Sequence, residues 1–172
     1  MEQNHQRQGK RELLPNGGEK PMLEMMLPRP LSNEYRGSPI AKWVFVLLTV
    51  VTIVRSLIHV CASDGGAQSI ATIPLDSFTP EGAATVVSVF SLWGLSQLLL
   101  GLVYVVVLYR YRGLIPFMYM LLIVEYGARL FVGAFKPMET SGTAPGAVGD
   151  FIILPLAAIM LVLSLREQRT GS

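Results

Sequence analysis

The segment LLIVEYGARLF, residues 121–131, carries a carboxylate and a guanidinium inside an otherwise apolar run. Glu125 and Arg129 are four residues apart, so on a helix they lie one turn apart on the same face. A charged side chain that faces lipid near the middle of a bilayer costs about 2.5–3.5 kcal/mol on insertion scales, so such side chains turn inward and pair. The spacing therefore predicts either an internal ion pair that sets the rotation of the helix or a site for a ligand or ion.

Three other apolar runs also carry polar side chains at helical spacing. Arg55 and His59 belong to a stripe that also contains hydroxyl residues, in the segment TVVTIVRSLIHV. Gln97 stands between Gly94 and Gly101, and such small residues let a second helix approach closely while the amide bonds to it. The candidate polar cluster consists of Arg55, His59, Gln97, Glu125, Arg129 and Asp150.

The depth of these residues follows from the helical rise. At ~1.5 Å per residue, Arg55 and Arg129 both lie ~10 Å below the outer ends of their runs. Glu125 lies one turn deeper, close to the middle of the bilayer, and His59 lies one turn above Arg55. Because Glu125 can neutralise only one arginine, we expect Asp150 or a bound anion to pair with the other. For His59 we favour a structural or snorkelling role over a proton relay, and for Gln97 an interhelical hydrogen bond.

Four long apolar runs must position these side chains. The chain has 172 residues, of which 51% are hydrophobic and only 15% charged, too few charges to cover a soluble domain of this length. A helix needs about 20 apolar residues to cross a bilayer, and only helices satisfy their own backbone there. The sequence predicts an all-α, up-down bundle of four transmembrane helices, with spans at about 41–62, 83–109, 114–135 and 147–165.

The first 40 residues differ in composition from the rest of the chain. They are polar and rich in proline and glycine, so we expect residues 1–40 to form a disordered tail before a transmembrane domain at 41–168. Lysine and arginine concentrate in this tail, in the connection at 110–112 and after residue 165. Because short cytoplasmic segments carry the positive charge, both termini should be cytoplasmic, and we place the chain in the cell (inner) membrane.

The sequence lacks the motifs of several kinds of chemistry. One cysteine cannot form an internal disulfide, and no cysteine–histidine cluster has the spacing of a metal site. Phosphate-binding glycine loops and nucleophile motifs are also lacking, so we expect no catalytic residues and no metal ion. The basic residues are accounted for by membrane orientation, so a nucleic-acid partner is not expected.

One stretch resembles a known family. The run LWGLSQLLLGLVYVVVLYRYRGLIPFMYMLLIVEYGARLFVGAFKP is similar to the central hairpin of small four-helix bacterial membrane proteins of the DoxX-like type. The resemblance covers roughly residues 80–168, and its third-span element is GARL, with Gly127, Ala128 and Arg129. It implies a compact up-down bundle, and some relatives are linked to quinone or thiol redox steps. No cysteine pair is present here to support the thiol chemistry.

Three functions are compatible with these features. The first is an accessory or lipid-interacting membrane protein whose Arg/Glu cluster organises the bundle. The second is a membrane redox component in which Arg55, Glu125 and Arg129 hold a quinone headgroup. The third is a proton-coupled transporter of small molecules with Glu125 as the proton carrier. The expected partners are the lipid bilayer and either a second copy of the chain or another membrane protein.

Overall fold

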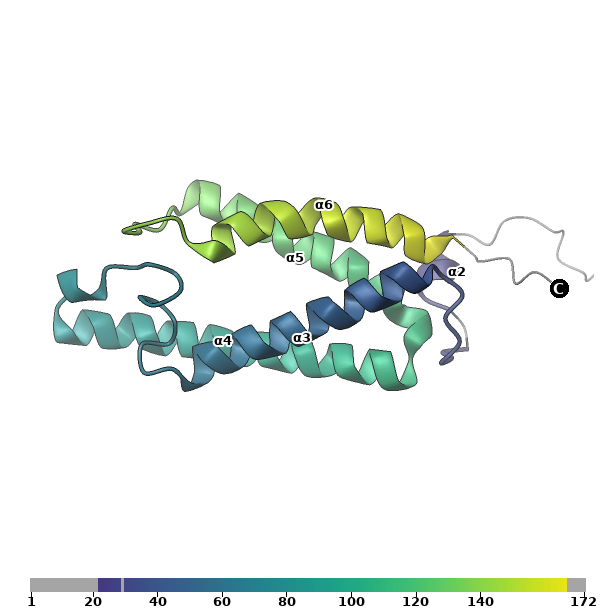
Figure 1. Cartoon of the computed structure of the whole chain (residues 1–172), viewed down its shortest axis with the longest axis horizontal. Coiled ribbons are helices and arrows are strands. Elements are labelled where there is room, and N and C mark those ends of the chain that lie inside the picture. Colours follow the sequence, from purple (N-terminus) through teal and green to yellow (C-terminus); the bar gives the residue numbers. More distant parts are fainter. Residues whose placement is uncertain (1–21, 29, 167–172) are drawn as a thin grey trace, which may run out of the picture.

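The computed structural model describes residues 22–28 and 30–166, and this part of the chain is all-helical (Figure 1). Four helices are long and apolar enough to cross a membrane, as in multi-pass membrane proteins. They are α3 (Pro39–Cys61), α4 (Pro80–Arg110), α5 (Ile115–Phe135) and α6 (Pro145–Leu165). The predicted spans agree with these helices to within three residues at every boundary.

The helix starts follow local sequence signals. Each of the four helices has proline at its first or second position, where a missing N–H costs no hydrogen bond. The hydroxyls of Ser38 and Thr79 accept hydrogen bonds from the amides of Ile40 and Gly82, which caps α3 and α4. The predicted start at Thr79 and Pro80 is confirmed, so α4 begins three residues before the expected span.

The helices form two hairpins: α3 packs mainly on α4, and α5 mainly on α6 (Figure 1). Glycines permit the close approach of the first pair, as the sequence predicted. A Cβ atom on Gly94 would lie 2.5 Å from Cβ of His59, and one on Gly101 would lie 2.9 Å from Cγ1 of Ile53. Any larger residue at either position would force α3 and α4 apart.

The main apolar core occupies one half of the bundle, and a smaller apolar cluster around Ala67, Ile73 and Leu75 packs at the other end. We call the half with the main core the terminal half, because α3 begins there and α6 ends there, and the other half the loop half. All the buried residues of α6 lie at or beyond Ala157, and those of α5 lie at or before Tyr126. The rings of Phe45 and Tyr104 pack edge to face at the centre of this core, with 5.2 Å between their centroids. Tyr119 ties α5 to α3 by donating its hydroxyl to the Ala41 carbonyl at 2.6 Å.

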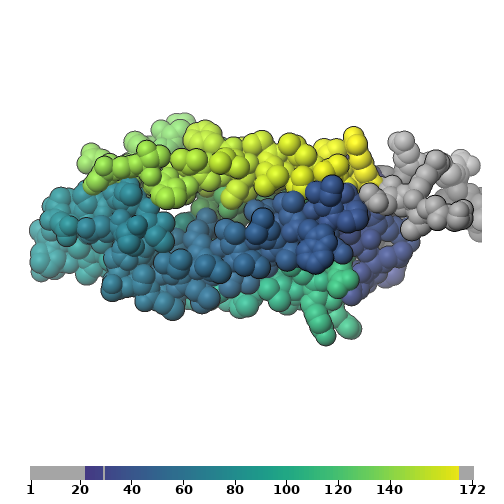
Figure 2. Space-filling model, viewed as in Figure 1, coloured from purple at the N-terminus to yellow at the C-terminus, as the bar shows by residue number. Residues whose placement is uncertain are grey.

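In the loop half the two hairpins separate. A Cβ atom added at Gly127, Gly133, Gly146 or Gly149 would meet no other atom within 4 Å. The two outer loops meet again at the end, where the Ser141 amide donates to the Thr72 carbonyl at 2.8 Å and Thr72 Oγ1 donates to the Gly142 carbonyl at 3.0 Å. Figure 2 shows an opening between the yellow-green part of α6 and the first hairpin. We call it the lateral opening.

Part of the segment before α3 packs on the bundle. Of the tail predicted at 1–40, the structure describes residues 22–28 and 30–40, and the other residues lie outside the described part. The short helix α2 (Met22–Met26) packs on α5 and buries Met26. The Ser38 amide then donates to the Leu163 carbonyl at 3.1 Å. The composition of this segment does not predict the contact, because the segment has no apolar face of its own and is held in place by the bundle.

The loop between α3 and α4 is organised by Asp64, as its turn sequence predicted. Its carboxylate accepts hydrogen bonds from the amides of Ser69 at 2.7 Å and Gly66 at 2.9 Å. These amides, Ser69 foremost, lower the pKa of Asp64 to about 2. Gly65 and Gly66 both have positive φ, which lets the chain turn back toward the carboxylate.

We expect the stability contribution of Asp64 to depend on pH in a defined window. Because its pKa is lower in the folded state, the contribution is fully present above the ordinary value of 3.8 and is lost as the pH falls toward about 2. The Asp64→Asn variant should therefore melt below wild type in detergent at pH 6, and the difference should shrink as the pH is lowered through this range. A difference in melting temperature that does not change with pH would contradict this account.

The close helix contact predicts a second difference in stability. Gly94→Ala places a methyl group against the backbone side of His59 and should destabilise the protein by about 1–3 kcal/mol, as overpacking does. Gly133→Ala is the matched control, because its methyl group enters open space. Thermal unfolding of both variants in the same detergent measures the difference, and equal melting temperatures would show that α3 and α4 are not in close contact.

Candidate functional site

The ion pair of α5 lies where the two hairpins begin to separate. Arg129 Nη2 lies 2.5 Å and Nε 3.1 Å from the same oxygen of Glu125, so the two groups neutralise each other directly. Both side chains are mostly buried, with 19% of Arg129 and 22% of Glu125 exposed. A charge-assisted pair of this kind satisfies Glu125 without any other helix.

Trp93 of α4 joins the two arginines. The guanidinium carbon of Arg129 lies 5.0 Å from the Trp93 ring centroid, and that of Arg55 lies 5.5 Å from the same centroid. Cation–π contacts of this kind contribute about 0.5–2 kcal/mol each, more when water is excluded. Arg129 also lies 5.0 Å from the ring of Tyr126. The two arginines therefore share one layer, at the depth expected from the helical rise.

Arg55 is less fully compensated than Arg129. Its Nη2 donates to Oε1 of Gln97 at 3.3 Å, which is the interhelical hydrogen bond expected for that glutamine. Its Nε is buried and has no hydrogen-bond partner. Within the described ranges no carboxylate lies in ion-pair distance of Arg55. We use the name polar layer for Arg55, Trp93, Gln97, Glu125 and Arg129.

Asp150 approaches this layer from α6. It lies on the same face of α6 as the buried residues Ala157 and Met160, nearer the loop end. It is close enough to Arg129, Arg55 and Glu125 to interact with them electrostatically. The expected ion pair is nevertheless absent: among the residues that the structure describes, Asp150 has no ion-pair or hydrogen-bond partner. The separation of the hairpins in the loop half holds its helix away from both guanidinium groups.

His59 has a structural position. Its Nδ1 lies 2.7 Å from the Gly65 carbonyl, and its ring packs on Trp93 and Phe90 with centroids 4.9 and 5.9 Å apart. The ring is buried against the backbone of Gly66 as well. His59 therefore connects the loop between α3 and α4 to the packing under it, which agrees with the structural role favoured for it.

Two aromatic residues of this region were not among the predicted site residues. Trp93 stands four residues before Gln97, so the stripe of Gln97 and Gly101 already pointed to it. Tyr104, seven residues after Gln97 on the same helix, is fully buried. Its hydroxyl has no hydrogen-bond partner, and it interacts electrostatically with Glu125 and Arg55. A tyrosine on the same face as Gln97 was a signal for an inward position.

The chemistry of this arrangement is that of binding. It offers guanidinium, amide and phenol groups together with two carboxylates, but no nucleophile with an adjacent base. Within the part of the chain that the structure describes, no group of three or more histidine, cysteine or acidic side chains could hold a metal ion. In the described part of the chain, the buried side-chain donors without a hydrogen-bond partner are Arg55 Nε and the Tyr104 hydroxyl.

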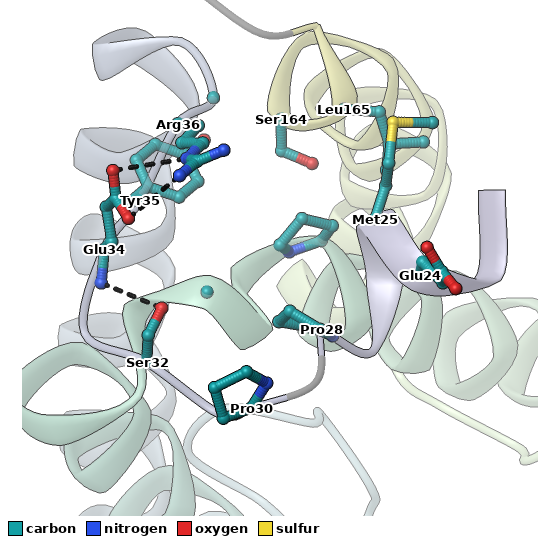
Figure 3. Close-up of a pocket in the computed structure, with 13 residues that line it drawn as sticks. Glu24, Met25, Pro28, Pro30, Ser32, Glu34, Tyr35, Arg36, Ser164 and Leu165 are labelled. Atoms are coloured by element: carbon teal, nitrogen blue, oxygen red, sulfur yellow. Dashed lines mark hydrogen bonds and ion pairs between the residues drawn. The ribbon is translucent and has the colours of Figure 1, made fainter. Parts of the chain in front are cut away.

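A separate cavity of about 290 Å³ lies at the terminal end (Figure 3). It is enclosed between the segment around Glu24 and Met25, the turn at Tyr35 and Arg36, and the end of α6 at Ser164. Arg36 is paired with Glu34 at 3.1 Å beside it. Prolines and backbone form much of its wall, and it lies at the opposite end of the core from the lateral opening.

Comparison with known proteins adds no assignment: no family model, no curated protein and no solved structure matches this chain. The function is therefore argued from the site.

The role of Trp93 can be tested by stability. Trp93→Leu removes the ring that both guanidinium groups contact and should lower the free energy of unfolding by about 1–3 kcal/mol. Trp43→Leu is the control, because Trp43 is 64% exposed and contacts only the Lys42 ammonium at 5.4 Å. The free energy of unfolding of both variants is measured in the same detergent. An equal loss of stability in the two variants would contradict the role of Trp93.

Proposed function

We propose that this chain is a small integral membrane protein that binds the polar head of a membrane amphiphile at the polar layer. The observation that carries the proposal is Arg55, a guanidinium for which the described residues supply no carboxylate partner and no hydrogen-bond partner at Nε. A charge in that position costs free energy unless a ligand or water compensates it. The ligand would be an accessory lipid of the bundle or a molecule that the protein handles.

The shape of the molecule supports entry from the bilayer. The lateral opening lies between the two hairpins (Figure 2). Both hairpins expose apolar side chains, such as Leu99, Phe131 and Ile152. An amphiphile could place its head at Arg55 while its chains remain among apolar side chains of this kind.

The membrane location belongs to the same proposal. Lysine and arginine gather at the terminal end, so the positive-inside rule places that end in the cytoplasm and the polar layer in the outer half of the cell membrane. The DoxX-like resemblance is compatible with the four-helix architecture and stays a prediction. So does the partnership with a second copy or with another membrane protein.

A quinone is the second candidate ligand, and Arg55 Nε is the observation that favours it. This buried N–H donor has no hydrogen-bond partner among the described residues, which suits a carbonyl oxygen. Aromatic rings of Trp93 and Tyr126 lie in the same layer. The transporter hypothesis is less well supported, because Glu125 would have to leave its two hydrogen bonds with Arg129 before it could carry a proton.

Native mass spectrometry of the purified protein tests the proposal. Wild type should retain a lipid or quinone through mild detergent, and Arg55→Gln should lose it by about tenfold or more, as expected when a charge-assisted contact is removed. Lys42→Gln is the control, because Lys42 lies at the terminal end and contacts only Trp43. An ultraviolet spectrum of the extract identifies a quinone, whose retention should also fall in Arg55→Gln.

Two results would overturn the proposal. One is a wild-type protein that carries no amphiphile after purification from native membranes. The other is an Arg55→Gln variant that is folded, as judged by its melting temperature, and retains as much amphiphile as wild type.

A further inference from the structure

The charges around the polar layer do not pair completely. Glu125 and Arg129 form one ion pair, which leaves Arg55 on α3 and Asp150 on α6. Neither has an ion-pair partner of opposite charge among the described residues, although the two are close enough to interact electrostatically. These residues belong to the two helices that border the lateral opening in Figure 2.

Two hydrogen-bond donors near the polar layer have no partner among the described residues. Arg55 Nε and the Tyr104 hydroxyl are both buried without a partner, and Tyr104 is fully enclosed by the core. A guanidinium N–H can only donate, so the group that complements Arg55 is an oxygen acceptor, most favourably an anionic one. Asp150 has the opposite requirement, because a carboxylate accepts hydrogen bonds and pairs with a cation.

We infer that the site binds a zwitterionic phospholipid head, with its phosphate at Arg55 and its ammonium at Asp150. This inference rests on the proposed function and adds the chemical class of the ligand. Such a head satisfies both unpaired charges at once and leaves the net charge of the layer unchanged.

Other amphiphiles satisfy the site less completely. An anionic head without an ammonium would neutralise Arg55 but would bring a second negative charge beside Asp150 and Glu125. A quinone carbonyl could accept a hydrogen bond from Arg55, but it would leave Asp150 without a cation. The zwitterion is therefore the class that compensates both Arg55 and Asp150.

The test is lipid selectivity in a defined membrane. The full chain is reconstituted into nanodiscs with equal amounts of phosphatidylethanolamine and phosphatidylglycerol and then extracted into mild detergent. The retained lipids are counted by native mass spectrometry. Wild type should retain more phosphatidylethanolamine than phosphatidylglycerol. Because this comparison needs no variant, it tests the inference even if a substitution prevents folding.

Two variants test the ammonium contact and the phosphate contact separately. Asp150→Asn should lower the ratio of phosphatidylethanolamine to phosphatidylglycerol by about fivefold, because only the ammonium loses its partner. Arg55→Gln should lower the retention of both lipids by about tenfold and leave their ratio unchanged, because both carry the phosphate. Glu139→Gln is the control for Asp150, since it removes an exposed carboxylate of the neighbouring outer loop.

The possible failures are distinguishable. A wild-type preference for phosphatidylglycerol, or an unchanged ratio in folded Asp150→Asn, overturns the zwitterion while Arg55-dependent retention still supports the proposed function. Retention of neither lipid by wild type, or equal retention by Arg55→Gln, overturns both.

Discussion

Two guanidinium groups from different hairpins contact one indole ring, and the rest of the loop half depends on that contact. Arg55 reaches Trp93 from α3 and Arg129 reaches it from α5, so like charges are held near each other by an aromatic ring and by Glu125. In a low-dielectric interior each such contact is stronger than in water, and so is the cost of any group that stays unpaired. The hairpins are therefore coupled through polar contacts where their apolar contacts end.

The division of the bundle into a packed half and an open half follows from where large side chains occur. The terminal half contains Phe45, Tyr104 and Tyr119, which fill the space between all four helices. Toward the loop end the inward faces of α5 and α6 continue with glycine and Asp150, which cannot fill a gap of the same width. The loops close this gap at its end through Thr72, whose φ of 56° is unusual for a β-branched residue and marks a position held by its surroundings.

This arrangement separates structural from ligand-binding roles within one set of polar residues. His59 and Gln97 have partners inside the protein, and Glu125 and Arg129 satisfy each other. Arg55, Tyr104 and Asp150 do not have their full complement among the described residues. Tyr104 lies inside the core, whereas Arg55 and Asp150 belong to the two helices that border the lateral opening. The position of these two unpaired charges connects the charge pattern with the proposed binding of amphiphiles.

The amino-acid sequence by itself determined the four helices, their boundaries to within three residues, the position of Glu125 and Arg129 one turn apart on one helix face and the common layer of the two arginines. Hydrophobic run length and the 3.6-residue period set these features, and both are local. Only the tertiary structure decided that Tyr104 is buried, that Trp93 lies between the arginines, that Asp150 stays unpaired and that residues from Met22 pack on the bundle. The physical reason is that these outcomes depend on the distance between helices, which follows from the volumes of side chains far apart in the chain and not from periodicity along it.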